Sequence, residues 1–234
     1  MNLGRNELCW CGSNIKYKKC HLNRSSQTAV QESVLHKELN RFNTDKKCSA
    51  STIFKDECSK KIVKAHSVSK SSSLKEIAVD GHVLTFFMAQ RNTDYTVLEP
   101  VSIGINKAST FNGFCKVHDK KLFSPFEDNP FDLSSYHCFL IMYRTVSREL
   151  FVKESCKGTF GLVKEMDKGK DIFEQMYIQD RYRHFNGSND LTISDLKNIK
   201  SSLEKMLISK DYDQLEHVII ELETPPKVMS SSIG

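Results

Sequence analysis

Three cysteines and one histidine near the start of the chain constrain its fold more than any other feature. Two of the cysteines form a Cys-x-Cys pair, and Gly12 and Ser13 directly after it allow the chain to reverse. A stretch of about twenty residues is too short to bury a sufficient apolar core, so a bound metal has to supply most of the folding energy. Three sulfur ligands and one nitrogen ligand are typical of a closed, tetrahedral zinc site. The sequence therefore predicts a structural zinc site within residues 5–21, with the ligands Cys9, Cys11, Cys20 and His21.

A second set of cysteines and histidines follows with wider spacing. Cys115 and His118 form a Cys-x2-His half-site, which we expect at the start of a short helix. Cys48 and Cys58 could complete a Cys3His tetrahedron, although the residues between them are more numerous than the usual spacing of about two to four. The alternative is that Cys48 and Cys58 are ordinary residues of a lysine-rich loop and that Cys115 is a buried thiol. The first hypothesis predicts a second zinc ion, held by Cys48, Cys58, Cys115 and His118.

The expected compartment supports metal sites over disulfides. The first ten residues, MNLGRNELCW, lack the apolar stretch of a secretory signal, and no run of 18 apolar residues exists that could span a membrane. We therefore expect a cytoplasmic protein. In a reducing cytoplasm a cysteine cluster is more often a metal site or a catalytic group than a disulfide.

Charge is distributed unevenly along the chain. Residues 1–75 contain 15 lysines and arginines against 6 acidic residues, a net charge of +9, whereas the remainder carries 19 against 23, a net charge of −4. This asymmetry favours an acidic partner for the first half, either nucleic acid or an acidic protein surface. The alternative is a lysine-rich face that is simply solvated.

Residues 5–21 closely resemble the SEC-C motif, the zinc-binding tail of the bacterial preprotein translocase ATPase, which is also fused to many other proteins. The four candidate ligands fall at the spacing of the motif, and the Gly-Ser pair and the Lys-Tyr-Lys-Lys run at 16–19 match its body. Trp10 stands where the motif usually has proline, and Asn14 where it usually has glycine. The resemblance implies protein docking and, in some contexts, contact with ribosomes or acidic lipids. The chain has no phosphate-binding Gly-rich loop, so it is not the translocase motor.

The later cluster resembles the treble-clef arrangement of HNH nucleases. A cysteine pair is followed by a strand with Ala65 and His66, and then by Cys-x2-His and Asp119. The resemblance implies that His66 is a general base and that Asp119, in place of a helix histidine, holds a divalent ion such as magnesium or manganese. Asn112 is a candidate for the middle asparagine. The chain departs from the pattern in the long gap after His66, in the wide cysteine pair and in Asp119 itself. His66 could instead ligate zinc or form a hydrogen bond within the domain.

A wider stretch, from Ala65 through the Phe-Asn-Gly-Phe-Cys run at 111–115 to Tyr143-Arg144, is similar to an uncharacterised group of bacterial proteins. Some members of that group also carry a SEC-C knuckle, which supports a shared zinc fold. Its members extend beyond the last residue of this chain, so the resemblance implies that residues 229–234 are a truncated end.

The pattern along the chain predicts an α+β fold. Apolar spacing predicts helices over 27–42, from Ser134 or Ser135 to about 155, over 160–184, and after a cap at Ser194 as far as Leu207. Short strands are expected at 62–63, 83–88 and 95–105, and Leu215–Leu222 could be helix or strand. The expected parts are a zinc knuckle over 1–24, a helical linker over 25–45, a treble-clef-like domain over 46–132, a helical region over 133–226 that could mediate oligomerisation, and a tail over 227–234.

Three functions are compatible with these features. The favoured hypothesis is a zinc protein whose basic N-terminal half binds an acidic partner. The second is a divalent-metal-dependent nuclease that uses His66 and Asp119. The third is a structural adaptor with no catalytic activity, whose knuckle docks a protein.

Overall fold

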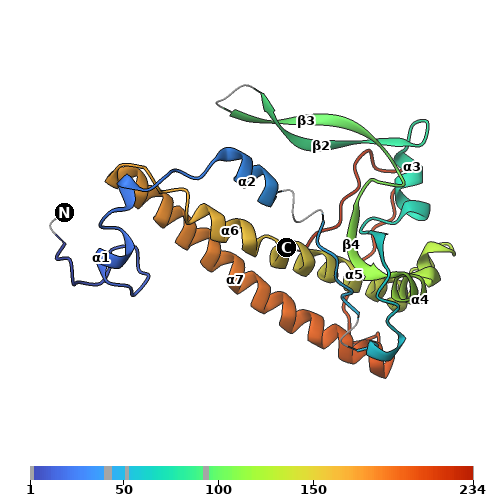
Figure 1. Cartoon of the computed structure of the whole chain (residues 1–234). Helices are drawn as coiled ribbons and strands as arrows, with labels where there is room; N and C mark the ends of the chain where they lie inside the picture. The colour runs from blue at the N-terminus through green and yellow to red at the C-terminus, as the bar shows by residue number, and fades with distance from the viewer. Residues whose placement is uncertain (1–2, 40–43, 51–52, 92–94, 234) are drawn as a thin grey trace. The chain divides into compact units, whose positions relative to one another are not determined.

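The chain folds as an α+β protein, as the sequence predicts, and a computed structural model describes residues 3–39, 44–50, 53–91 and 95–233 (Figure 1). It divides into two compact units. The first consists of Met1–Asp45 and Val152–Asp195, and the second of Lys46–Phe151 and Leu196–Gly234. Each unit is described separately below.

The first unit combines the N-terminal segment with helices from the later part of the chain. Its described helices are α1 (Tyr17–Cys20), the 3-10 turn η1 (Arg24–Ser26), α2 (Glu32–Leu39), α6 (Lys157–Val163) and the beginning of α7 (Ile172–Ser209). The helix expected over 27–42 begins later, at Glu32, and residues 40–42 lie outside the described residues.

The helix predicted over 160–184 is interrupted by a turn between α6 and α7, and residues 194–207 are helical as predicted but belong to a helix that already begins at Ile172. Gly169 has a φ of +75°, and a Cβ at this position would lie 3.0 Å from the carbonyl oxygen of Gln27. Asp171 then caps α7, since its carboxylate accepts hydrogen bonds from the backbone N–H groups of Phe173 and Glu174. From there α7 continues without interruption through Ser194.

The second unit is built on an antiparallel strand pair and the helix that follows it. Strand β1 (Ile62–His66) pairs with β4 (Thr110–Cys115), and the register shifts between Val63 and Ala65. Helix α4 (Lys116–Glu127) begins directly after β4, and α5 (Ser135–Ser155) follows. The core between them is aromatic: the rings of Phe114 and Phe123 meet edge to face with centroids 5.0 Å apart.

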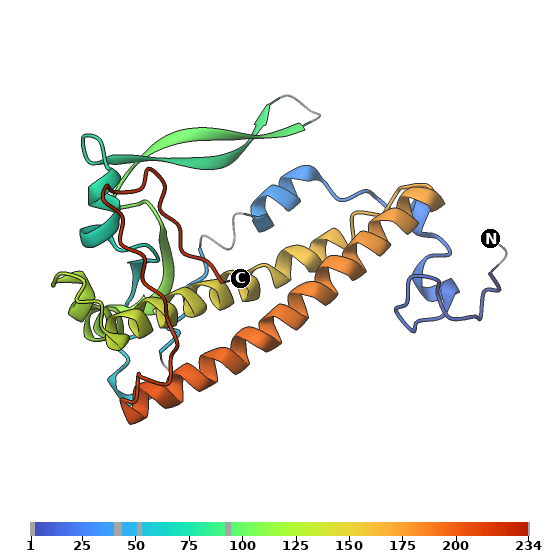
Figure 2. The same ribbon diagram turned by 180° about the vertical axis from the view of Figure 1, so that it is seen from behind.

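A long excursion separates β1 from β4 in the sequence. It contains a π-helical turn η4 (Lys70–Leu74), α3 (Lys75–Ile77) and the hairpin of β2 (His82–Arg91) and β3 (Tyr95–Gly104), while a short 3-10 turn η3 (Lys55–Glu57) precedes β1. Figures 1 and 2 show β2 and β3 as a two-stranded ribbon of their own. The strands expected here are therefore present, and the strand predicted at 62–63 extends as far as His66.

The segment after α7 is irregular. Residues 210–233 form turns and extended chain, so the helix or strand expected over Leu215–Leu222 is not formed. The side chains of this apolar run have no core to enter: Val218 is 88% exposed and Ile220 is 78% exposed. Apolar periodicity stabilises an element only where another surface covers its apolar face.

A buried ion pair joins α4 to α5 in the second unit. The Arg144 side chain is 3% exposed, donates to a Glu127 carboxylate oxygen at 2.5 Å, and lies over the ring of Phe123 at 4.1 Å. Burial raises the pKa of Glu127, but the hydrogen bond and charge of Arg144, with hydrogen bonds from Ser69 and Ser71, outweigh this effect and hold the pKa below its usual value. Glu127 and Arg144 therefore form a charged pair that links α4 to α5.

Replacing Glu127 by glutamine should destabilise the fold by about 3 kcal/mol, because the buried Arg144 guanidinium loses the carboxylate to which it is directly hydrogen-bonded. Urea unfolding followed by circular dichroism measures the loss. The folded-state pKa of Glu127 is lowered, so its stabilisation is present at neutral pH and disappears as the pH falls through that pKa. The difference between wild type and E127Q should shrink accordingly in acid.

The matched control is Glu149→Gln, which removes the partner of Arg148, a side chain that is 37% exposed. An exposed pair of this kind contributes about 0–1 kcal/mol. Equal urea midpoints for E127Q and E149Q would contradict the account of the buried pair.

Candidate metal centres and an adjoining polar pocket

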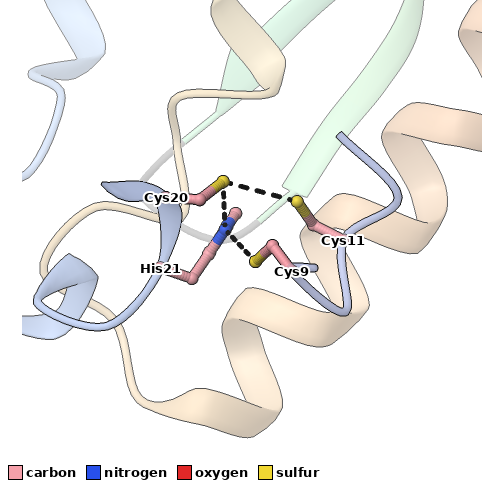
Figure 3. Close-up of side chains that lie close together, drawn as sticks. All are labelled: Cys9, Cys11, Cys20 and His21. Carbon is pink, nitrogen blue, oxygen red and sulfur yellow. Dashed lines mark hydrogen bonds between the residues drawn. The ribbon is translucent and has the colours of Figure 1, made fainter. Parts of the chain in front are cut away.

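A tight turn and the short helix α1 bring the first four candidate ligands together. The turn closes by hydrogen bonds from Cys9 N to the Ile15 carbonyl at 2.8 Å and from Gly12 N to the Cys9 carbonyl at 3.2 Å. Gly12 has a φ of +76°, which explains why glycine occupies this position. Figure 3 shows the side chains converging on one point; they are Cys9, Cys11, Cys20 and His21.

The spacing of these atoms fits a tetrahedral zinc ion. All four ligand atoms lie within 4.8 Å of one another. The sulfur atoms of Cys11 and Cys20 are 3.5 Å apart, and His21 Nδ1 lies 3.3 Å from the Cys9 sulfur and 3.1 Å from the Cys20 sulfur. Around zinc, with metal–sulfur bonds of about 2.3 Å and metal–nitrogen bonds of about 2.0 Å, neighbouring ligand atoms are separated by about 3.5–3.8 Å. The cluster is therefore close to the required size, and its four ligands leave no coordination position open.

The thiols of this cluster differ in acidity. Burial raises the pKa of Cys9 to about 12. At Cys11 burial also opposes ionisation, but hydrogen bonds from Ser13, Cys20 and Cys9 outweigh it and lower the pKa to about 7. Cys11 is thus the thiol that ionises first near neutral pH, whereas Cys9 needs the charge of a bound cation to lose its proton.

An acidic residue far away in the sequence holds the other side of the His21 ring. His21 Nε2 is 2.8 Å from a carboxylate oxygen of Asp167, a residue that is fully buried. The same carboxylate accepts hydrogen bonds from Arg24 Nε at 2.6 Å and from Gln179 Nε2 at 2.7 Å. Sequence analysis missed Asp167, because nothing in the local pattern marks one aspartate among the charged residues of 164–171.

The second cluster assembles at the start of α4. Cys115 is the N-cap of this helix, and its sulfur accepts a hydrogen bond from His118 N at 3.5 Å. The loop with Cys48 is fastened to β4, because Ser49 N donates to the Gly113 carbonyl at 2.8 Å. The Cys48 sulfur then lies 3.2 Å from His118 Nδ1. All four ligand atoms lie within 4.8 Å of one another; they belong to Cys48, Cys58, Cys115 and His118.

Local hydrogen bonds favour one thiolate in this cluster too. Burial raises the pKa of Cys115, but hydrogen bonds from Ser59, from the backbone of His118 and from Cys48 reverse the effect and lower the pKa to about 6. Burial raises the pKa of Cys48 to about 11. The donor set is again three sulfur atoms and one imidazole nitrogen, which suits zinc in a closed site.

His66 and Asp119 lie on the walls of one cavity of about 460 Å³, beside the second cluster. Successive residues of a helix point about 100° apart, so that His118 can face the cluster while Asp119 faces the cavity. Asp119 Oδ1 is buried and has no hydrogen-bond partner among the described residues, and burial raises the pKa of this carboxyl. Other residues of the cavity wall are Lys70, Lys120, Glu127 and Arg144.

The hydrogen bond of His66 defines the state of its ring. Its Nε2 atom is 2.9 Å from the carbonyl oxygen of Ile105. A carbonyl can only accept, so Nε2 carries a proton in this contact and donates it to Ile105. His66 is part of neither cysteine cluster, and Asn112 is not one of the cavity-lining residues.

The first cluster has the form of a closed Cys3His zinc knuckle. Residues 5–23 match the SEC-C motif family, which confirms the resemblance for this short segment. Comparison of the chain with curated proteins and with solved structures found no match. Among the described residues, no helix is both long enough and apolar enough to cross a membrane.

Two zinc ions per chain should be measured in the purified wild-type protein by inductively coupled plasma mass spectrometry. Cys20→Ser and Cys115→Ser should each lose one ion, because each substitution removes a sulfur ligand from a different cluster. The control is Cys138→Ser, which alters a partly buried thiol outside both clusters. A single zinc ion, lost only in C20S, would contradict the second site.

Proposed function

We propose that this chain is a zinc-stabilised, HNH-like nuclease that hydrolyses phosphodiester bonds in nucleic acid. The observation that carries the proposal is the shared cavity of His66 and Asp119, which come from β1 and α4. A concave site that combines a candidate base, a buried carboxylate and cationic side chains is the usual form of a hydrolytic centre. In this proposal nucleic acid is the acidic partner that the basic N-terminal half suggests.

Zinc has a structural role in this scheme. In the second cluster, four protein ligands would fill the coordination sphere and leave no position for water or substrate. The ion would instead fasten the loop with Cys48 and Cys58 to the beginning of α4. Since Asp119 directly follows the ligand His118, the ion would also fix the position of the cavity carboxylate.

His66 is the proposed general base. The Ile105 carbonyl holds the Nε2 proton, so Nδ1 is available to accept a proton from water. The register shift in β1 just before Ala65 sets the direction of the strand end from which His66 projects.

Asp119 is the proposed ligand of a divalent ion such as magnesium or manganese. Its Oδ1 atom is buried without a hydrogen-bond partner, and carboxylate oxygens are the ligands that both ions prefer. When bound, such an ion neutralises the charge that develops on the phosphate. Lys70 and Lys120 on the cavity wall would attract the phosphate backbone of the substrate.

A second candidate function is binding of nucleic acid without cleavage. A separate surface hollow beside the second cluster is lined by four exposed lysines, together with Cys48, Cys58 and Ile62. Lysines gathered on one face bind polyanions through sequence-independent contacts with phosphates. The lysines are Lys46, Lys47, Lys55 and Lys60. The adaptor hypothesis, in which the knuckle docks a protein, would need neither this hollow nor the cavity.

Cleavage of plasmid and single-stranded DNA in the presence of manganese tests the proposal. His66→Ala and Asp119→Asn should each lower the rate at least about 100-fold, because they remove the base and the ion ligand. Both variants should keep the zinc content of the wild type. The matched control is His82→Ala, which removes an exposed histidine of β2 and should leave cleavage unchanged.

Cleavage that survives in H66A would contradict the assigned base. If wild type binds DNA with an affinity that falls steeply with salt but never cleaves it, the binding function is correct and the nuclease is not. If it neither cleaves nor binds, the adaptor hypothesis is the one that remains.

A further inference from the structure

We infer that Asp167 is a positioning residue for the first zinc site, and that zinc bound there clasps the knuckle to the turn between α6 and α7. The inference concerns the first unit alone and is independent of the proposed nuclease. It gives the knuckle a partner of defined chemistry, a buried carboxylate of its own chain.

The contacts of Asp167 show why this carboxylate matters to the metal site. One of its oxygens lies 2.8 Å from His21 Nε2, while His21 Nδ1 faces the sulfur atoms of the cluster. A carboxylate accepts but cannot donate, so it holds the proton on Nε2 and leaves the lone pair on Nδ1 for the metal. Such a partner also fixes the plane of the ring and makes the ligand nitrogen more basic.

Hydrogen-bond donors surround the negatively charged carboxylate of Asp167. The residue is fully buried, and its two oxygens accept hydrogen bonds from Arg24 Nε at 2.6 Å and from Gln179 Nε2 at 2.7 Å, besides the bond to His21. All three partners are donors directed at one buried acceptor. A buried carboxylate is tolerated only with such compensation.

Backbone contacts extend the same connection to the whole turn. Arg24 Nη2 donates to the Lys164 carbonyl at 3.2 Å, Gln179 Nε2 donates to that carbonyl at 2.8 Å, and Gly169 N donates to the Arg24 carbonyl at 3.1 Å. The knuckle and residues 164–171 therefore share one hydrogen-bond network. Coupling between two sites is reciprocal. If the turn strengthens zinc binding, bound zinc must stabilise the turn by the same free energy.

A consequence is that the knuckle already has one partner within its own chain. The edge of His21 that points away from the metal is already occupied by Asp167. Zinc occupancy therefore determines whether the turn at 164–171 is ordered against the N-terminal segment. The knuckle then acts as a metal-dependent clasp within the first unit.

Asp167→Asn tests the positioning role in the full chain. An asparagine has one oxygen, which accepts hydrogen bonds, and one NH₂ group, which donates them. Because the partners of Asp167 are all donors, the NH₂ group would face a donor and lose that hydrogen bond. In competition with a chromophoric zinc chelator, one of the two ions should bind about 10–100-fold more weakly than in wild type. The matched control is Asp195→Asn, the same chemical change at an exposed position of α7, which should leave both affinities unchanged.

A second measurement tests the clasp without a substitution that could prevent folding. Limited trypsin digestion of the wild-type chain should be slow at Lys164, Lys168 and Lys170 with zinc bound, and at least about tenfold faster once a chelator removes the ion. D167N with zinc should be cleaved at these lysines at an intermediate rate. Wild-type zinc affinity in D167N, or the same cleavage rate at these lysines with and without zinc, would overturn the inference.

Discussion

Three thiols and an imidazole within 4.8 Å of one another are an arrangement that a polypeptide rarely maintains without a bound metal, and the described residues contain it twice. Sulfur atoms at this distance gain little from each other, and their thiolates repel. A zinc ion reverses the balance, because it displaces the three thiol protons and replaces weak contacts among the four groups with four metal–ligand bonds. In the first unit the cluster organises a segment with almost no apolar core. In the second it joins a loop to the start of α4 across a wide gap in sequence.

Helix α4 connects the second cluster with the polar cavity. His118 faces the cysteines, while Asp119, Phe123 and Glu127 follow one another at intervals of four residues along another stripe of the same helix. Arg144 of α5 lies over Phe123 and pairs with Glu127, and its charge also acts on Asp119. One helix therefore carries a ligand of the metal site, a ring of the aromatic core and the candidate ion ligand Asp119.

The sequence identified residues whose type signals metal binding and failed where nothing local marks a tertiary contact. Residue type and spacing pointed to the eight thiol and imidazole groups that the structure brings together, although Cys48 and Cys58 are more widely spaced than usual. By contrast, Ser194 has the residue type of a helix cap, yet it lies inside α7, because this helix already begins at Ile172, where Asp171 caps it. Asp167 could not be found from sequence, because its partner His21 is 146 residues away. The apolar run around Val218 predicts regular structure only if another surface covers it.

The two Cys3His sites are the central claim, and X-ray absorption spectroscopy at the zinc edge tests it most directly. The measurement requires no variant and reports the atoms bound to the metal. The account predicts an average shell of about three sulfur atoms at about 2.3 Å and one nitrogen at about 2.0–2.1 Å for the fully loaded chain. A shell dominated by oxygen and nitrogen, or one sulfur-rich zinc ion per chain with the other on surface groups, would contradict it.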